Sequence, residues 1–242
     1  MNKKTKIWLI VAAFLVIIGG IIFAFAMEAY DWDFKKLNTL QYEENVSLIS
    51  ENFENISINT DTADVLLVPY EENACKVVCY ESEKTKHTVE VHDNTLVISI
   101  SDEREWYEHI GINIGSQKIT VYLPEREYSN LHIETTTGDI TLRKDLAFEN
   151  IDASVNTGDV MVSALASDTL KVNTSTGDVH LDNCDAGEIF VETSTGDIEG
   201  RLLSEKVFIA KTSTGDIDVP KTIHGGRCEL ITSTGDIEIV TK

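Results

Sequence analysis

The chain has 242 residues, and its 42% content of hydrophobic residues is enough for one elongated domain or two small ones. The formal net charge is -21. Lys3, Lys4 and Lys6 are the only charged residues before Glu28, so the remainder holds 17 of the 20 basic residues against 41 acidic ones, a net charge of -24. Such a surface repels nucleic-acid phosphates and anionic lipid headgroups, so we expect no nucleic-acid partner.

The N-terminal segment predicts a membrane anchor. Residues 7–27 contain no charged side chain, and a helix of that length spans a bilayer core of about 30 Å. The lysines before it and the acidic Glu28 and Asp31 after it place residues 1–6 in the cytoplasm as a short tail, with the rest of the chain outside the cytoplasm. We therefore expect a single-pass protein of the cell membrane.

A cleaved signal peptide is the alternative reading of the same segment. Ala24-Phe25-Ala26 has the small-x-small pattern of a cleavage site. The apolar region of a signal peptide usually runs about 7–15 residues, which is shorter than this stretch. The length favours an uncleaved anchor.

Residues 28–44 are interpreted as a juxtamembrane linker, and residues 45–130 as the irregular N-terminal part of a repeat domain. Trp32 and Phe34 of the linker suit either the membrane interface or packing as a cap, and the sequence leaves both open. Alternating apolar and polar residues predict strands at 76–80, 88–92, 95–100 and 118–123. A turn at Asp93-Asn94 and an irregular loop over 102–116 interrupt them.

Residues 131–242 contain a short motif six times. The motif is Thr-Gly-Asp, and its glycines are spaced by 19 or 20 residues, which is typical of stacked repeats. The six copies are Thr137-Gly138-Asp139, Thr157-Gly158-Asp159, Thr176-Gly177-Asp178, Thr195-Gly196-Asp197, Thr214-Gly215-Asp216 and Thr234-Gly235-Asp236.

Apolar residues alternate with polar ones on both sides of each motif. In one copy Leu170 and Val172 precede the motif, and Val179 and Leu181 follow it. This pattern predicts two half-buried strands joined by a tight turn. Because one such unit cannot bury its apolar face alone, we predict an all-β, single-domain β-solenoid of 19–20-residue coils. Residues 55–67 read as a degenerate copy.

The aspartates of the motif predict a column of carboxylates about 5 Å apart, where each close pair costs of order 1 kcal/mol. Two arrangements offset this cost: hydrogen bonds from turn amides and neighbouring hydroxyls, or calcium bound between coils. The nine-residue period of calcium-binding repeats is absent, which favours the amides. The candidate calcium ligands are Asp139, Asp159, Asp178, Asp197, Asp216 and Asp236; no other cofactor is expected.

A second column precedes each motif threonine and predicts a flat, hydroxyl-rich outer face. Such a face suits an extended glycan or a peptide strand, although solvated Ser and Thr ladders also occur as plain decoration. The column consists of Thr136, Asn156, Ser175, Ser194, Ser213 and Ser233.

Cysteines and histidines give no catalytic or metal-binding pattern in the sequence. Cys75 and Cys79 lie about 13 Å apart on one predicted strand, beyond disulfide reach. Cys184 and Cys228 occupy inward repeat positions and are interpreted as buried apolar residues. The six histidines are scattered and predict no ligand cluster, and no nucleophile elbow or phosphate loop occurs. We expect no enzyme.

The C-terminal copy ends at Val240, and only Thr241 and Lys242 follow it. We therefore expect that nothing covers the final coil. An uncovered strand edge invites pairing with another chain, so self-association through this coil is one reading. The other, which the sequence favours, is that a short edge ending in lysine is tolerated.

The Thr-Ser-Thr-Gly-Asp-Ile/Val repeats resemble those of the putative adhesin family of bacterial β-strand-repeat proteins. With the N-terminal anchor, the layout is similar to that of membrane-anchored members associated with envelope stress. The resemblance implies a β-solenoid in the cell envelope without established catalysis and implies no binding residues.

The resulting hypothesis is a non-catalytic, membrane-anchored, extracytoplasmic β-solenoid with a binding or stress-accessory role in the bacterial envelope. Its partners are the membrane and an envelope protein, a glycan or a cationic peptide. The alternative is a surface adhesin for a glycan or a host or cell-wall ligand, and a polysaccharide-active enzyme is the remote alternative.

Overall fold

A computed structural model describes residues 2–29, 31–32, 42–102 and 117–242. Most of the expected linker (28–44) and of the irregular loop (102–116) lies outside these residues. The chain divides into two compact units: residues 1–41 with 105–115, and residues 42–104 with 116–242. Each unit is described by itself.

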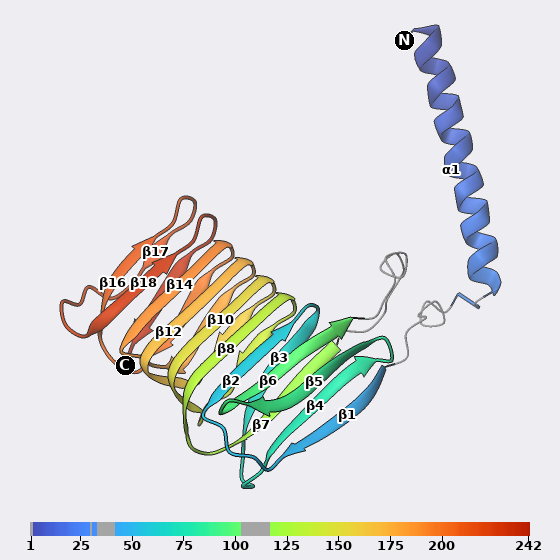
Figure 1. Ribbon diagram of the computed structural model, residues 1–242. Coiled ribbons are helices and arrows are strands. Elements are labelled where there is room, and N and C mark those ends of the chain that lie inside the picture. Colours follow the sequence, from blue (N-terminus) through green and yellow to red (C-terminus); the bar gives the residue numbers. More distant parts are fainter. Residues whose placement is uncertain (1, 30, 33–41, 103–116) are drawn as a thin grey trace. The chain divides into compact units, whose positions relative to one another are not determined.

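The described part of the first unit is essentially one helix, α1 (Lys3–Ala29). Its length and apolar composition are sufficient to cross a membrane. Figure 1 shows it as a straight helix. A signal sequence meets the same criteria, so the helix itself is compatible with both readings of the N-terminal segment.

The second unit consists of strands hydrogen-bonded into one sheet that coils around a single core. The strands are β1 (Tyr42–Ile49), β2 (Asn55–Thr60), β3 (Ala63–Tyr70), β4 (Cys75–Ser82), β5 (Thr85–His92), β6 (Thr95–Asp102), β7 (Gln117–Pro124), β8 (Glu127–Thr137), β9 (Ile140–Leu142), β10 (Ala147–Thr157), β11 (Val160–Val162), β12 (Leu165–Thr176), β13 (Val179–Cys184), β14 (Glu188–Thr195), β15 (Ile198–Leu202), β16 (Lys206–Lys211), β17 (Ile217–Asp218), β18 (Gly226–Ile231) and β19 (Ile237–Thr241).

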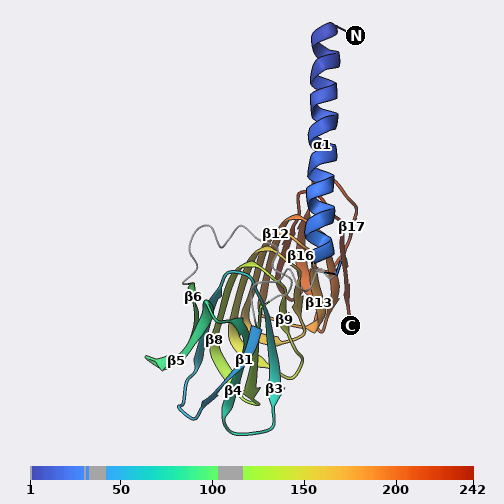
Figure 2. The ribbon, with the colours of Figure 1, turned by 90° about the vertical axis from the view of Figure 1, so that its right-hand side faces the viewer.

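Each coil contributes one strand before the Thr-Gly-Asp turn and one after it, and both pair in parallel with the next coil. Leu170 lies between Ile151 and Ile189, its equivalents one repeat earlier and one later. Val179 lies likewise between Val160 and Ile198. The predicted β-solenoid and its 19–20-residue period are therefore confirmed. Figure 2 views the stack from its β1–β4–β5 end.

The N-terminal end of the stack does not follow chain order. The degenerate copy, β2 and β3, pairs directly with β8 and β9, and Ile56 is aligned with Leu131 as the repeat pattern predicts. Strands β6 and β7 form the next layer beyond it. Strands β1, β4 and β5 then add antiparallel pairings at this end. The predicted turn at Asp93-Asn94 is confirmed by positive φ angles at both residues.

The order of the last two coils differs from the order in the sequence. The last copy, β18–β19, is not the end of the stack, because it lies between β14–β15 and β16–β17. Cys228 pairs with Ile189 on one side and with Phe208 on the other. Hence the expectation of an uncovered C-terminal coil is wrong. The last coil of the stack is β16–β17, whose edge is limited by the two-residue β17 and by Pro220.

The core consists of the inward columns that the repeat predicts. All four cysteines are buried and free, which confirms the interpretation of Cys184 and Cys228 as apolar core residues. Burial raises the pKa of each of these thiols to about 12. They are therefore protonated and poor nucleophiles near neutral pH.

Candidate functional site

The Thr-Gly-Asp turns stack so closely that only glycine fits at their centre. Gly177 has a φ of +148°, a conformation that residues with a side chain rarely adopt. A Cβ atom at this position would lie 2.0 Å from the carbonyl oxygen of Gly158 in the preceding coil. The glycine therefore allows consecutive turns to lie in contact along one edge of the solenoid.

The motif aspartates form a hydrogen-bonded ladder along this edge. The backbone N–H of Asp178 donates to Oδ1 of Asp159 at 2.8 Å, and the N–H of Asp197 donates to Oδ1 of Asp178 at 2.8 Å. The same bond joins the other neighbours in the stack, including Asp236 to Asp197 and Asp216 to Asp236. The expected turn-amide hydrogen bonds are confirmed, and they offset part of the repulsion between the carboxylates.

Buried threonines fix each turn to its neighbour from the inner side. The hydroxyl of Thr174 donates to the carbonyl of Gly158 at 3.3 Å, and that of Thr193 donates to the carbonyl of Gly177 at 3.2 Å. A hydroxyl at this inward position satisfies a turn carbonyl that a valine would leave without that partner. This contact gives a physical reason for the threonines at this inward position.

The predicted outer column is exposed along its whole length. Ser175 Oγ lies 3.5 Å from Oδ1 of Asn156, and the backbone N–H of Thr234 donates to the carbonyl of Ser194. The column therefore continues across neighbouring coils, although Ser233 precedes Ser213 in the stack. We call the six motif aspartates and the six outer-column residues the turn edge. In spatial order the outer column is Thr136, Asn156, Ser175, Ser194, Ser233 and Ser213.

The turn edge is acidic and contains no basic side chain among its twelve positions. In the described part of the chain, its carboxylates do not form a group of three potential metal ligands with donor atoms within 4.8 Å of one another. Calcium binding by these aspartates stays a prediction. The arrangement presents regularly spaced carboxylates beside hydroxyl and amide groups, which suits a ligand with repeated positive charges.

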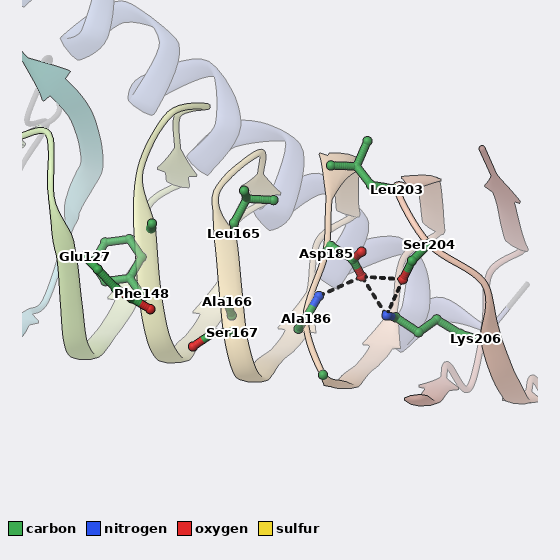
Figure 3. A pocket seen from close by; sticks show the side chains of 12 residues that line it. Glu127, Phe148, Leu165, Ala166, Ser167, Asp185, Ala186, Leu203, Ser204 and Lys206 are labelled. Atoms are coloured by element: carbon green, nitrogen blue, oxygen red, sulfur yellow. Dashed lines mark hydrogen bonds and ion pairs between the residues drawn. The ribbon is translucent and has the colours of Figure 1, made fainter. Parts of the chain in front are cut away.

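A groove lies near the start of the strands that precede the turns, and the sequence does not predict it. It has a volume of about 600 Å³ and crosses successive coils between Phe148 and Leu203 (Figure 3). Lys206 is buried at one end, where its Nζ lies 2.6 Å from Asp185 Oδ1 and 2.7 Å from Ser204 Oγ. Because this lysine is already paired, it serves to hold the chain where it passes from β15 to β16.

A buried polar cluster near the N-terminal end corrects the expectation that no histidine joins a ligand cluster. Among the described residues, Cys79, Glu81 and His87 are the one group whose potential ligand atoms all lie within 4.8 Å of one another. His87 Nδ1 lies 3.0 Å from Glu81 Oε2, and Thr60 Oγ1 lies 2.9 Å from His87 Nε2. Burial lowers the pKa of His87, although Glu81 acts in the opposite direction.

Comparisons with known proteins agree with this architecture. The sequence profile of the Toastrack DUF4097 family matches residues 53–242. A solved structure described as a "putative cell adhesion protein" from Clostridium sporogenes is 18% identical, covering 84% of this chain and all of that one, with a TM-score of 0.51. A "putative adhesin" from Bacteroides fragilis is 15% identical, covering 83% and 97%, with a TM-score of 0.50. No curated protein sequence matches significantly. These likenesses show the fold.

Proposed function

Because the chain belongs to the Toastrack DUF4097 family, we propose that it is a non-catalytic binding protein of the bacterial cell envelope. The observation that carries the proposal is the turn edge, an exposed and regular surface built by six copies of one motif. Its carboxylates are held in place by backbone hydrogen bonds, so binding a ligand there requires little ordering of the protein. The descriptions of the solved relatives as adhesion proteins favour binding over catalysis.

Helix α1 anchors the protein in the membrane, with the solenoid on the outer side. The support is its length and composition, together with the lysines that precede it and the acidic residues that follow it. An ectodomain with a net charge of -24 is repelled by anionic headgroups, which favours a solenoid that stands away from the lipid surface.

The ligand that fits best is a cationic peptide or a cationic segment of an envelope protein. Along the ladder, the hydrogen bond from the next coil goes to Oδ1 of each bonded aspartate, so Oδ2 takes no part in the ladder. Neighbouring carboxylates therefore offer charge at the spacing of successive coils, about 4.8 Å. A cation between two of them relieves the repulsion that the backbone amides only partly offset.

An adhesin that binds a neutral glycan is the alternative function. The outer column of Ser and Thr hydroxyls and the descriptions of the relatives favour it. Hydroxyl groups recognise sugars through neutral hydrogen bonds, so this binding is insensitive to salt. The two functions thus differ in a property that is simple to measure.

The test uses the full chain in neutral detergent micelles and a labelled oligolysine peptide as the probe. The triple variant D159N/D178N/D197N removes three charges but keeps an Oδ1 acceptor in each turn. We expect its Kd to rise about tenfold, since three partly exposed charge pairs contribute about 1.5 kcal/mol together. Wild-type binding should also weaken steeply with salt, because screening shortens from about 10 Å at 0.1 M to about 3 Å at 1 M.

A matched control removes three exposed carboxylates outside the turn edge, with the variant E149Q/E188Q/E238Q. Its net charge equals that of the first variant, so a nonspecific charge effect changes both alike. Equal weakening in the two variants contradicts a site at the turn edge. Binding that does not change between low and high salt contradicts the cationic ligand.

A further inference from the structure

We propose that Cys79, Glu81 and His87 bind one divalent transition-metal ion of the zinc type inside the N-terminal end of the solenoid. Their donor atoms lie within 4.8 Å of one another, and all three residues are buried. The cluster is separate from the turn edge, so the proposal does not rest on the proposed function.

The distances suit a small tetrahedral ion. Zn–N and Zn–O bonds are about 2.0–2.1 Å long, which places two such ligand atoms about 3.3 Å apart in a tetrahedron. His87 Nδ1 and Glu81 Oε2 are already 3.0 Å apart. The backbone N–H of His87 donates to the same Oε2 at 2.6 Å, which holds the carboxylate in place. A metal ion that replaces the ring hydrogen therefore needs little change in the distance between Nδ1 and Oε2.

The ligand types also select the metal class. A thiolate, an imidazole and a carboxylate together favour zinc or cobalt, whereas calcium and magnesium prefer oxygen ligands alone. Calcium at the motif aspartates would thus be a different site with different chemistry.

Two neighbouring residues orient the proposed ligands through hydrogen bonds to their other polar atoms. Thr60 Oγ1 lies 2.9 Å from His87 Nε2, and Asn45 Nδ2 donates to Glu81 Oε1 at 3.2 Å. When Nδ1 binds the metal, Nε2 carries the ring hydrogen and donates it to the Thr60 hydroxyl. Metal-binding histidines typically have such a partner on their second nitrogen.

A buried polar atom without a hydrogen-bond partner lies on the neighbouring strand β7. Gln117 Oε1 is the one buried side-chain polar atom among the described residues without a hydrogen-bond partner. Strand β7 pairs with β4 so that Lys118 lies opposite Tyr80. One further step in this register places Gln117 opposite Glu81. Both residues then lie on the inward face of the sheet, and the proposal assigns the amide oxygen of Gln117 as the fourth ligand, directly or through a water molecule.

Metal binding has a defined proton balance. On binding the metal, the Cys79 thiol gives its proton to solvent and coordinates as the thiolate. His87 stays neutral, because its hydrogen only changes from Nδ1 to Nε2. One proton is released for each metal ion, so affinity increases with pH. The bound ion links β4 to β5 and reinforces the antiparallel end of the solenoid.

The test titrates Co²⁺ into the full chain in detergent after chelator treatment, and then repeats the experiment with Zn²⁺. We expect one equivalent of Co²⁺ to produce a thiolate-to-cobalt charge-transfer absorption and Zn²⁺ to raise the Tm. Cys79→Ser should abolish the absorption. Glu81→Gln, which keeps one oxygen acceptor beside His87 but removes the negative charge, should weaken Co²⁺ binding by at least about tenfold.

Cys75→Ser is the matched control, since Cys75 is a buried cysteine on the same strand but belongs to no ligand group. It should keep the full absorption. Co²⁺ ions bound weakly to exposed carboxylates give no thiolate-to-cobalt absorption, so they do not produce the same result. The proposal is overturned if folded wild-type protein shows no such band and no Zn²⁺-dependent rise in Tm, or if Cys79→Ser retains the band.

Discussion

Replacing Gly177 with alanine is expected to lower the free energy of unfolding by on the order of 4 kcal/mol. Forcing a residue with a side chain into a glycine-only conformation costs about 1–3 kcal/mol, and overpacking a tight contact costs a similar amount. Both apply here, because φ is +148° and the new Cβ lies 2.0 Å from the Gly158 carbonyl oxygen. Urea unfolding of the full chain, followed by circular dichroism, measures the effect.

Ser175→Ala is the control for this substitution, since Ser175 lies two residues away on the exposed column. Its effect should stay within about 0.5 kcal/mol, as is usual for surface positions. Equal stability of wild type and Gly177→Ala would show that the turns are not in contact and that the turn edge is not the continuous surface described above.

Ile237→Ala is expected to destabilise the protein more than Ile217→Ala does. Both isoleucines follow a Gly-Asp turn in the same inward column, but Ile237 is 1% exposed and Ile217 is 45% exposed. Removing a fully buried isoleucine side chain to alanine costs about 2–5 kcal/mol. We expect such a loss for Ile237 and less than about 1.5 kcal/mol for Ile217, since the latter already contacts solvent.

The same pair of variants tests the order of the coils. If the coils followed chain order, Ile237 would lie in the terminal coil and Ile217 inside the stack. A larger loss for Ile217→Ala than for Ile237→Ala, measured by urea unfolding under identical conditions, contradicts the inserted last coil.

The sequence predicts which residues face inward, because the period of 19–20 residues determines the inward columns directly. It predicts the alignment of the degenerate copy for the same reason: Ile56 and Leu131 occupy equivalent positions. The turn glycines and the exposed outer column follow from the motif. These features depend on local pattern, which one chain displays in full.

The order of the last two coils is not predictable from that pattern. Every coil carries the same inward columns, so the period says nothing about which coil lies next to which. A local signal does exist at Gly225-Gly226, where a Cβ on Gly226 would lie 1.7 Å from the carbonyl oxygen of Gly187. That close approach occurs because β18 enters beside β14, and the sequence shows two glycines without showing their neighbour.

The cluster around His87 was missed for a related reason. Cys79 and Glu81 lie two residues apart on one strand, and His87 follows on the next strand after a short turn. Metal-site spacings such as Cys-x-x-Cys describe ligands within one turn or loop. Here an antiparallel pairing brings the third ligand close, and the partner Thr60 comes from yet another coil.

The most direct test of the central claim, that the turn edge binds a partner, is photo-crosslinking in living cells. A photoreactive residue replaces Ser175, Ser194 or the control Lys144, which is exposed between β9 and β10 outside the turn edge. We predict a discrete crosslinked band from both Ser175 and Ser194 and none from Lys144. Intact membrane-bound protein that gives no band at the two serines, or the same band at all three positions, contradicts the claim.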